Sequence, residues 1–389
     1  MATTSLEGPT RDHLHWPFFA TDHVDIARRL DQFATSGPLD HVDHHAVDAE
    51  CRRLAKAMGE IGLLALATGD AGRTEIDSRS LCLARETLAW HDGLADFVFA
   101  MQGLGTGAVH LGGSGPLRET VLAKATSGEW LSAFALSEAD AGSDVAAMAC
   151  AAKRERDHFI LDGEKTWISN GGIADVYTVF ARTGEAPGTR GISAFVVFPD
   201  DPGFSIAERI DVIAPHPLAT LRFEGCRIPA DRLLGNPGEG FKLAMRTLDI
   251  FRASVAAAGL GLARRALDEA VAYARTRPMF GATLGDLQMT QARIADMATG
   301  IDSAALLTYR AAWQRDVLKQ PTTREAAMAK LMATEQAQTV IDGCVQLFGA
   351  RGVVSGNVPE RLYRDIRALR IYEGASEVQK LIIARSYLK

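Results

Sequence analysis

One carboxylate near the C-terminal end of the chain has neighbours that suit proton transfer. Glu373 follows Ile371 and Tyr372, which are largely apolar, and burial beside them would raise the pKa of its carboxyl group. It precedes Gly374, which permits positive φ and close approach of the backbone. A carboxylate with a tuned pKa on a rigid loop can act as a general base. The same residues also fit a solvent-exposed glutamate in a helix–helix turn.

Two helices are expected to position this glutamate. Residues 361–370 have a polar helical pattern, and Ser376 with Gln379 three residues later is a capping-box sequence that starts a new helix. The N-terminus of that helix would oppose the rise in the Glu373 pKa. Glu373 is therefore expected in a short break between two helices.

Helical patterns fill the chain on both sides of a β-rich middle. Before it, helices are expected over about 77–91, through Phe97, Phe99 and Met101, and along an apolar face made by Leu54, Met58, Ile61 and Leu64. After it, long helices are expected over about 241–275, over 287–318, and from Thr322, where Thr322 and Glu325 form another capping box.

The middle of the chain has the texture of strands joined by turns. Short β-rich runs, including HFILDGEKTWIS (158–169), are separated by Gly, Pro and Asp. No helical stretches alternate with them and no GxGxxG is present, which argues for an antiparallel sheet or barrel and against a Rossmann unit. The predicted class is α+β: a helical domain (1–130), a β-domain (131–235) and a helical bundle (236–389).

Composition restricts the classes of partner. The net charge of −6 argues against nucleic acid or an anionic membrane as the main partner, and no apolar run reaches the length of a membrane span. Five scattered cysteines without CxxC spacing predict neither disulfides nor a zinc site, and no secretory signal is seen, so a cytoplasmic location is expected. The His-rich residues 1–45 are interpreted as a solvated helix with a loose arm rather than a metal site.

The segment RDIRALRIYEGASEVQ (364–379) resembles the C-terminal motif of the acyl-CoA dehydrogenase family. In that family the matching glutamate removes the α-proton of an acyl-CoA thioester while the β-hydride passes to N5 of FAD, giving the trans-2-enoyl-CoA. Some members carry the base on the long helix after the β-domain, but the matching residue here is Phe251, which leaves Glu373. The resemblance implies a central β-barrel or sandwich and a C-terminal four-helix bundle.

Further motifs imply an FAD site. FALSEADAGSD (134–144) and KTWISNGG (165–172) are similar to the segments that contact the flavin, and RTRPMFGATLGDLQ (275–288) and QLFGARG (346–352) to those that reach the FAD of a neighbouring subunit. Residues that the resemblance assigns to FAD are Phe134, Leu136, Ser137, Gly142, Ser143, Trp167, Ser169, Arg277, Phe280, Gln288, Gln346, Gly349, Ala375 and Glu377. Ala375 stands where most members have Thr, so weaker FAD retention is expected.

The resemblance also implies substrate residues and partners. Residues assigned to acyl-CoA are Ser143, Asp249, Phe251, Arg252, Tyr372 and Gly374, although Asp249 and Arg252 also fit a surface ion pair. A homotetramer, a dimer of dimers, is implied, with an electron-transferring flavoprotein as acceptor. The acyl group and the choice between CoA and acyl carrier protein stay open. Alternatives are a flavin oxidase or monooxygenase of the same superfamily, and a non-catalytic, DNA-binding flavin protein, which the net charge disfavours.

Overall fold

The computed structural model of the protein describes residues 8–69 and 75–388. Its internal contacts divide the chain into two compact units. The helical unit comprises the described residues of Met1–His41, Asp77–Asp96 and Phe251–Lys389, and the sheet unit those of Val42–Ile76 and Phe97–Ile250. The boundaries predicted at 130 and 235 from sequence texture stay a prediction.

The sheet unit is built on one eight-stranded sheet, whose main path runs in the order β6-β7-β3-β2-β4-β5-β8. Its strands are β1 (Ser132–Ala135), β2 (Ala151–Glu155), β3 (His158–Ser169), β4 (Val176–Arg182), β5 (Ile192–Val197), β6 (Phe204–Arg209), β7 (Leu218–Pro229) and β8 (Leu233–Leu234). The sheet is not purely antiparallel, because β4 pairs in parallel with β1 and β2. Strand sequences show where strands form, whereas their partners depend on the path of the connecting loops.

Both faces of the sheet are covered, because successive side chains of a strand point to opposite faces. In β4, Tyr177 and Val179 belong to one apolar cluster, while Val176 and Phe180 belong to another. The second cluster includes side chains of α5 (Gly93–Gly112), α6 (Gly115–Thr126) and the start of α7 (Gly240–Thr276). The unit also contains α2 (Val47–Glu60), α3 (Ala65–Thr68) and the 3-10 helices η2 (Val145–Ala147), η3 (Gly188–Gly191) and η4 (Ala230–Arg232).

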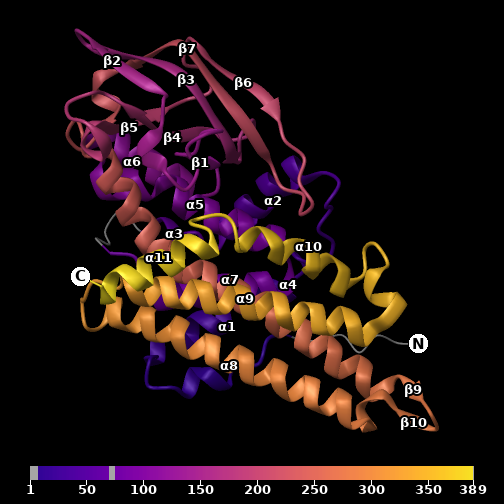
Figure 1. Cartoon of the computed structure of the whole chain (residues 1–389). Helices are drawn as coiled ribbons and strands as arrows, with labels where there is room; N and C mark the ends of the chain where they lie inside the picture. The colour runs from indigo at the N-terminus through magenta and orange to yellow at the C-terminus, as the bar shows by residue number, and fades with distance from the viewer. Residues whose placement is uncertain (1–7, 70–74, 389) are drawn as a thin grey trace. The chain divides into compact units, whose positions relative to one another are not determined.

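Long antiparallel helices form the helical unit. Figure 1 shows α9 between α8 on one side and α10 and α11 on the other. The helices are α1 (Thr21–Thr35), α4 (Ser78–His91), the later part of α7, α8 (Gln288–Asp316), α9 (Thr323–Phe348), α10 (Val358–Leu369) and α11 (Ser376–Tyr387). Shorter elements are η1 (Asp12–His15), η5 (Leu284–Asp286), η6 (Gly349–Val353) and the hairpin of β9 (Pro278–Met279) and β10 (Ala282–Thr283).

The predicted loose arm at the N-terminus is wrong for the described residues. His13 is buried, stacks on Tyr309 with ring centroids 5.2 Å apart, and lies 3.7 Å from the carboxylate of Glu86. His23 is also buried and lies 3.1 Å from Asp77. Burial lowers the pKa of His13, because water no longer stabilises its charged form. Residues 1–7 lie outside the described part of the chain.

Two smaller expectations are also corrected. Ile61 was expected on the apolar face of its helix, but α2 ends at Glu60 and the Ile61 side chain is 46% exposed. Thr322 precedes α9 as predicted, yet no side-chain capping bond forms, because the Glu325 carboxylate pairs with Arg324. The five cysteines are buried and unpaired. Within the described residues, none of the helices has the combined length and apolarity that crossing a bilayer requires.

Candidate active site

The predicted break between two helices contains the candidate base. α10 ends at Leu369 and α11 begins at Ser376, and Glu373 between them has a φ of 52°. This left-handed conformation is uncommon for a residue with a side chain and often marks a functional position. Gly374 follows with a φ of 93°, and a Cβ there would lie 2.6 Å from Nε2 of Gln379. The break therefore requires glycine at position 374.

The first residue of α11 is held by tertiary contacts rather than by a capping box. Ala375 is the N-cap residue and makes no side-chain capping bond. The hydroxyl of Ser376 donates instead to Oε1 of Glu335 on α9, at 2.5 Å. The Gln379 amide turns back and donates to the carbonyl oxygen of Gly374 at 2.8 Å. The predicted capping box is therefore wrong, although the helix begins where it was expected.

Helix α9 holds residues 370–376, called the base loop from here on. The ammonium group of Lys330 donates to the carbonyl oxygens of Tyr372 at 2.6 Å and Gly374 at 2.5 Å. One helical turn further along, Glu335 accepts hydrogen bonds from Arg370 at 3.0 Å and from Ser376. Both ends and the centre of the base loop are thus attached to one helix.

The carboxylate of Glu373 lies in a field dominated by cations. Its Oε2 is shielded from solvent and has no hydrogen-bond partner among the described residues. Burial raises the pKa of Glu373, and the nearby charges of Arg85, Lys330 and Arg252 oppose that rise. The rise was expected from burial beside Ile371 and Tyr372, but Ile371 is 57% exposed. The rise in the Glu373 pKa is opposed by three cations rather than by the helix terminus alone.

A buried ion pair lies next to this carboxylate. The guanidinium of Arg85 on α4 makes two hydrogen bonds of 2.8 Å with the carboxylate of Asp96 and one of 3.1 Å with the Ser254 hydroxyl. The same cation opposes the effect of burial, which raises the pKa of the Tyr372 hydroxyl. All of these residues lie in the helical unit. The carboxylate of Glu373 therefore shares its surroundings with a compensated ion pair and a tyrosine.

Sequence reasoning missed Arg85, Asp96, Lys330 and Glu335. A signal was present for two of them: Arg85 stands in LCLARETLAW and Lys330 in AAMAKLMA, each a cation within an apolar helical stretch. Buried cations are rare unless a partner or a function requires them. Lys330 is 1% exposed, and burial lowers its pKa to about 8, with Arg252 adding to the decrease and Glu373 and Glu335 opposing it.

Residues 136–144 of the sheet unit, called the flavin loop from here on, carry the first predicted FAD motif. The carbonyl oxygen of Ser137 accepts a hydrogen bond from the backbone of Thr166 at 3.0 Å, which places this loop beside the KTWISNGG motif. Lys165 is fully buried and donates to the Leu136 carbonyl at 3.1 Å and to the Glu138 carboxylate at 2.7 Å. Two predicted motifs are therefore joined within one unit.

Trp167 is the exposed aromatic residue of this region. Its side chain is 58% exposed and its φ is 60°, at a register shift of β3 against β7 between Lys165 and Ile168. Ile168 points into the core and Ser169 is half-buried. An aromatic face open to solvent, with hydroxyl groups and exposed loop backbone nearby, fits a planar ring with a phosphate tail, such as FAD. Gly142 and Ser143 are exposed, Leu136 is buried and Phe134 is half-buried.

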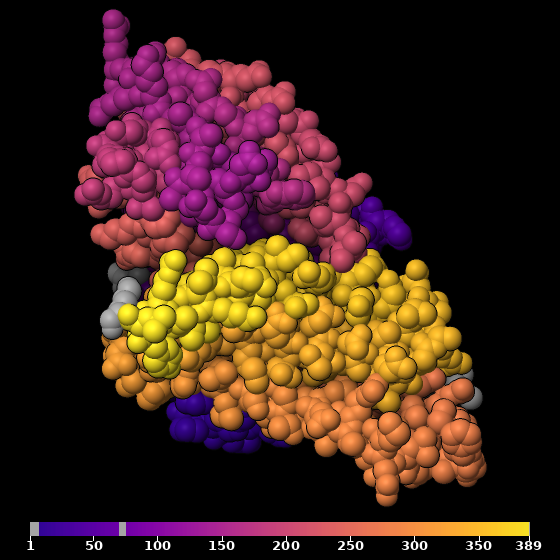
Figure 2. Space-filling model, viewed as in Figure 1, coloured from indigo at the N-terminus to yellow at the C-terminus, as the bar shows by residue number. Residues whose placement is uncertain are grey.

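The residues assigned to a neighbouring subunit's FAD lie on the surface of the helical unit. Phe280 is 92% exposed at the tip of the β9–β10 hairpin, where it and Gly281 both have positive φ. This pattern is that of a type I′ turn, which asparagine or glycine usually occupies. Arg277, Gln288, Gln346 and Gly349 are exposed as well. Figure 2 shows the helices of this unit, orange to yellow, forming one continuous surface.

The residues assigned to acyl-CoA have different surroundings. Phe251 is fully buried, and Arg252 is buried close enough to Glu373 for its charge to oppose the rise in the Glu373 pKa. Asp249 is half-buried and belongs to the sheet unit, as does Ser143. Tyr372, Gly374 and Ala375 belong to the half-buried base loop, whereas Glu377 is exposed on α11.

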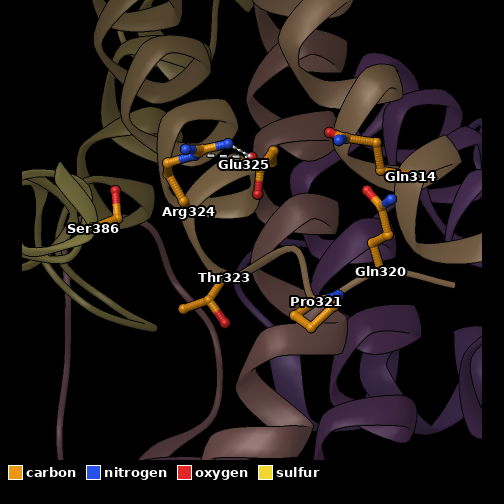
Figure 3. A pocket seen from close by; sticks show the side chains of 7 residues that line it. All are labelled: Gln314, Gln320, Pro321, Thr323, Arg324, Glu325 and Ser386. Carbon is orange, nitrogen blue, oxygen red and sulfur yellow. Dashed lines mark hydrogen bonds and ion pairs between the residues drawn. The ribbon is translucent and has the colours of Figure 1, made fainter. Parts of the chain in front are cut away.

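A shallow pocket lies elsewhere in the helical unit, where α8 ends and α9 begins (Figure 3). Its lining is polar: Gln314, Gln320, Pro321, Thr323, Arg324, Glu325 and Ser386. Its charged pair, Arg324 and Glu325, is satisfied by hydrogen bonds of 2.9 and 2.5 Å. None of the predicted site residues lines it. No group of acidic, cysteine or histidine residues suited to a metal ion is found within the described ranges.

Comparisons with known proteins identify the family. Residues 133–226 match the acyl-CoA dehydrogenase middle domain, and residues 238–388 match the acyl-CoA dehydrogenase C-terminal domain. The human short-chain specific acyl-CoA dehydrogenase of mitochondria is 41% identical over 338 residues, which cover 86% of this chain and 82% of that protein.

Solved structures agree. A chain from a structure described as the electron transferring flavoprotein of Acidaminococcus fermentans has a TM-score of 0.87 and 34% identity, covering 95% of this chain and 99% of that one. Butyryl-CoA dehydrogenase from Megasphaera elsdenii has a TM-score of 0.87 and 32% identity over the same shares. The chain belongs to the acyl-CoA dehydrogenase family. It is an FAD-dependent oxidoreductase that acts on acyl-CoA.

Proposed function

We propose that the protein oxidises a short-chain acyl-CoA to the trans-2-enoyl-CoA with Glu373 as the base. The observation that carries this proposal is the shielded Oε2 of Glu373, which has no partner among the described residues and is surrounded by three cations. The short chain is supported by the names of the human relative and of the Megasphaera enzyme.

The base loop supplies two groups to this reaction. The carboxylate of Glu373 takes the α-proton, and its raised pKa strengthens it as a base while the nearby cations favour its ionised form. The N–H of the same residue would donate to the thioester oxygen, because that carbonyl is bonded directly to the α-carbon. An α-proton of a thioester is weakly acidic, so the enolate oxygen needs such a preorganised donor.

Residues of the sheet unit would hold the cofactor. The exposed ring of Trp167, the Ser169 hydroxyl and the backbone of the flavin loop are suited to the flavin and its phosphates. When bound, FAD supplies the chemistry that accepts the hydride from the β-carbon, while the β-C–H bond breaks and the C=C bond forms.

The exposed residues around Phe280 support an assembly of several copies. An exposed phenylalanine in a left-handed turn is costly in a free chain, and it fits contact with another subunit. We infer a tetramer, a dimer of dimers, in which Arg277, Phe280, Gln288, Gln346 and Gly349 contact a neighbour's FAD. The electron acceptor would be an electron-transferring flavoprotein, and the location cytoplasmic.

Replacing the base tests the proposal. Glu373→Gln should retain FAD and bind butyryl-CoA, but anaerobic bleaching of the flavin near ~450 nm should slow by more than about 10³-fold, because the proton acceptor is gone. Glu129→Gln, at an exposed glutamate paired with Lys124, is the control and should behave like the wild type. Retained reduction in Glu373→Gln would refute the assignment of the base. A wild-type flavin that no acyl-CoA bleaches would refute the proposed reaction.

Replacing an exposed arginine tests the shared cofactor site. Arg277→Ala should loosen FAD binding and shift the assembly toward smaller species together, as seen by absorbance and by light scattering. If FAD is released without any change in mass, or the reverse, the site is not shared between subunits.

A further inference from the structure

Lys330 is a buried cation whose presence the proposed reaction has not yet explained. It lies on α9, is 1% exposed, and donates to the carbonyl oxygens of Tyr372 and Gly374 at 2.6 and 2.5 Å. Within the described part of the chain its hydrogen bonds go to these two carbonyls, and no carboxylate accepts a hydrogen bond from it. Burying an ammonium group without a carboxylate is costly. A buried charge that destabilises the fold in this way indicates a functional role for the charge.

The contact with Tyr372 orients the backbone of the base. The Tyr372 carbonyl and the Glu373 N–H belong to one peptide group, and no peptide bond of the described chain is cis. In a trans peptide the C=O and N–H point in opposite directions. Because the carbonyl faces Lys330, the Glu373 N–H points away from Lys330. No backbone carbonyl of the described residues accepts a hydrogen bond from this N–H, so it is available to a ligand.

The charge of Lys330 also changes the strength of that donor. A cation at a carbonyl oxygen draws electron density through the peptide group and makes its N–H a stronger hydrogen-bond donor. Low local polarity increases the effect. The second contact, with Gly374, fixes the peptide on the other side of Glu373, where Gln379 donates as well. The donor is thus held in place before any substrate arrives.

We propose that Lys330 is a positioning residue, whose ammonium group fixes and polarises the Tyr372–Glu373 peptide so that its N–H stabilises the enolate oxygen of the substrate. This inference rests on the proposed function, because it requires Glu373 to form that enolate. It adds a charged partner behind the backbone donor, on the side opposite to the substrate. The enolate oxygen would then interact with a donor whose strength depends on the protonation of Lys330.

This dependence predicts an alkaline limit to the reaction. Three charged groups face Lys330: Glu373 on the base loop, Arg252 on α7 and Glu335 on α9. The pKa of Lys330 is lowered to about 8. Above that pH the ammonium loses its proton and the peptide loses its polarising charge. The rate of flavin reduction should therefore fall as the pH rises through about 8.

The first experiment separates charge from hydrogen bonding. FAD-loaded wild type, Lys330→Gln and Lys330→Arg are mixed anaerobically with butyryl-CoA across pH 6.5 to 9.5, limits chosen to bracket ~8. Lys330→Gln keeps a donor without charge and should reduce its flavin about 10- to 100-fold more slowly, with substrate affinity within about threefold. Lys330→Arg should recover most of the rate and lose the alkaline fall, because arginine does not titrate there.

A second readout avoids flavin reduction altogether. Acetoacetyl-CoA is a thioester that ionises readily, and its enolate absorbs in the near ultraviolet. Wild type should bind it largely as the enolate, whereas Lys330→Gln should hold roughly tenfold less enolate at the same pH. Thr334→Val is the matched control, because its buried hydroxyl lies on the same helix and donates to the Lys330 backbone carbonyl at 2.9 Å. It should leave both readouts unchanged.

The outcomes distinguish this inference from the proposed function. A wild-type rate and enolate signal in folded Lys330→Gln would overturn the role of Lys330 while leaving Glu373 as the base. If neither variant folds, the wild-type profile decides, since a rate that stays flat from pH 7 to 9.5 would also overturn it. Retained reduction in Glu373→Gln would instead refute the proposed function itself.

Discussion

The base loop and the flavin loop are each held by a buried lysine, but only the lysine of the flavin loop is paired with a carboxylate. In each, a buried lysine donates to backbone carbonyl oxygens: Lys330 to the base loop and Lys165 to the flavin loop. Lys165 also pairs with Glu138 at 2.7 Å, and that carboxylate accepts hydrogen bonds from the backbone N–H groups of Ala149 and Cys150 at 2.6 and 3.0 Å. Lys330 has backbone carbonyls in place of a carboxylate.

This difference indicates that Lys165 mainly stabilises the structure of its loop, whereas Lys330 also changes the electrostatics of its loop. In the flavin loop the charge of the lysine is neutralised locally, so its contribution is to shape, and the pKa of Glu138 is lowered despite burial because Lys165 and two N–H groups stabilise its anion. In the base loop no carboxylate forms a hydrogen bond with the lysine, and burial lowers the pKa of Lys330 to about 8 although the charges of Glu373 and Glu335 oppose that change. The ammonium group of Lys330 therefore acts on the groups it contacts, which are the carbonyls on either side of Glu373.

The largest effect expected from this contrast is on folding stability. Lys165→Met should lower the free energy of unfolding by about 3–5 kcal/mol, because it leaves the Glu138 carboxylate beside apolar core without its cation. Lys330→Met should cost less than half of that, because Lys330 has no hydrogen-bonded carboxylate and the Glu373 carboxylate keeps the nearby cations Arg85 and Arg252. Urea unfolding followed by circular dichroism measures both. Equal losses would show that the two lysines are equivalent.

The second effect concerns the two glycines of these loops. Gly374→Ala should cost about 1–3 kcal/mol, because a Cβ would lie 2.6 Å from Gln379 and a φ of 93° is strained for alanine. Gly142→Ala in the flavin loop is the matched control. Its Cβ would meet nothing within 4 Å, so its stability should stay within about 0.5 kcal/mol of the wild type. Thermal unfolding of the two variants measures this difference in stability. A Gly374→Ala variant as stable as the wild type would refute the claim that the loop is strained at position 374.

The smallest effect is a pH dependence of folding stability that Lys330 should cause between pH 7 and 9. The pKa of Lys330 is about 8 when folded, below its ordinary value of 10.5, so between these values the unfolded chain binds more protons and stability rises with pH. From pH 7 to 9, wild type should therefore gain about 1 kcal/mol relative to Lys330→Met. Parallel urea titrations at the two pH values measure the gain. An unchanged difference would mean that Lys330 keeps an ordinary pKa when folded.

Local sequence was sufficient for elements whose residues form their own pattern. The bounds of β3 (His158–Ser169) match the β-rich run, and α4, α7, α8 and α9 lie where their periodicity predicted. The break at Glu373 was also predictable, because a glycine that tolerates positive φ stands beside it. These features depend on neighbours in the chain, whose preferences are local.

Features that depend on residues far apart in the chain were missed. The capping box at Ser376 is absent because Glu335, 41 residues away, accepts a hydrogen bond of 2.5 Å from its hydroxyl group. The N-terminal histidines were expected in solvent, yet His13 packs on Tyr309 of α8. Competing partners of this kind are invisible to a local pattern, because it cannot show which distant side chain lies closer.

The sequence by itself determined the family and its FAD dependence, and it singled out Glu373 as the predicted base, since its motifs are contiguous in the chain. Only the tertiary structure decided what surrounds that glutamate. Arg85, Lys330 and Arg252 come from three different helices, and their charges reach Glu373 only because the helical unit packs those helices around the base loop. A pKa depends on distances and burial, which are properties of packing rather than of sequence order.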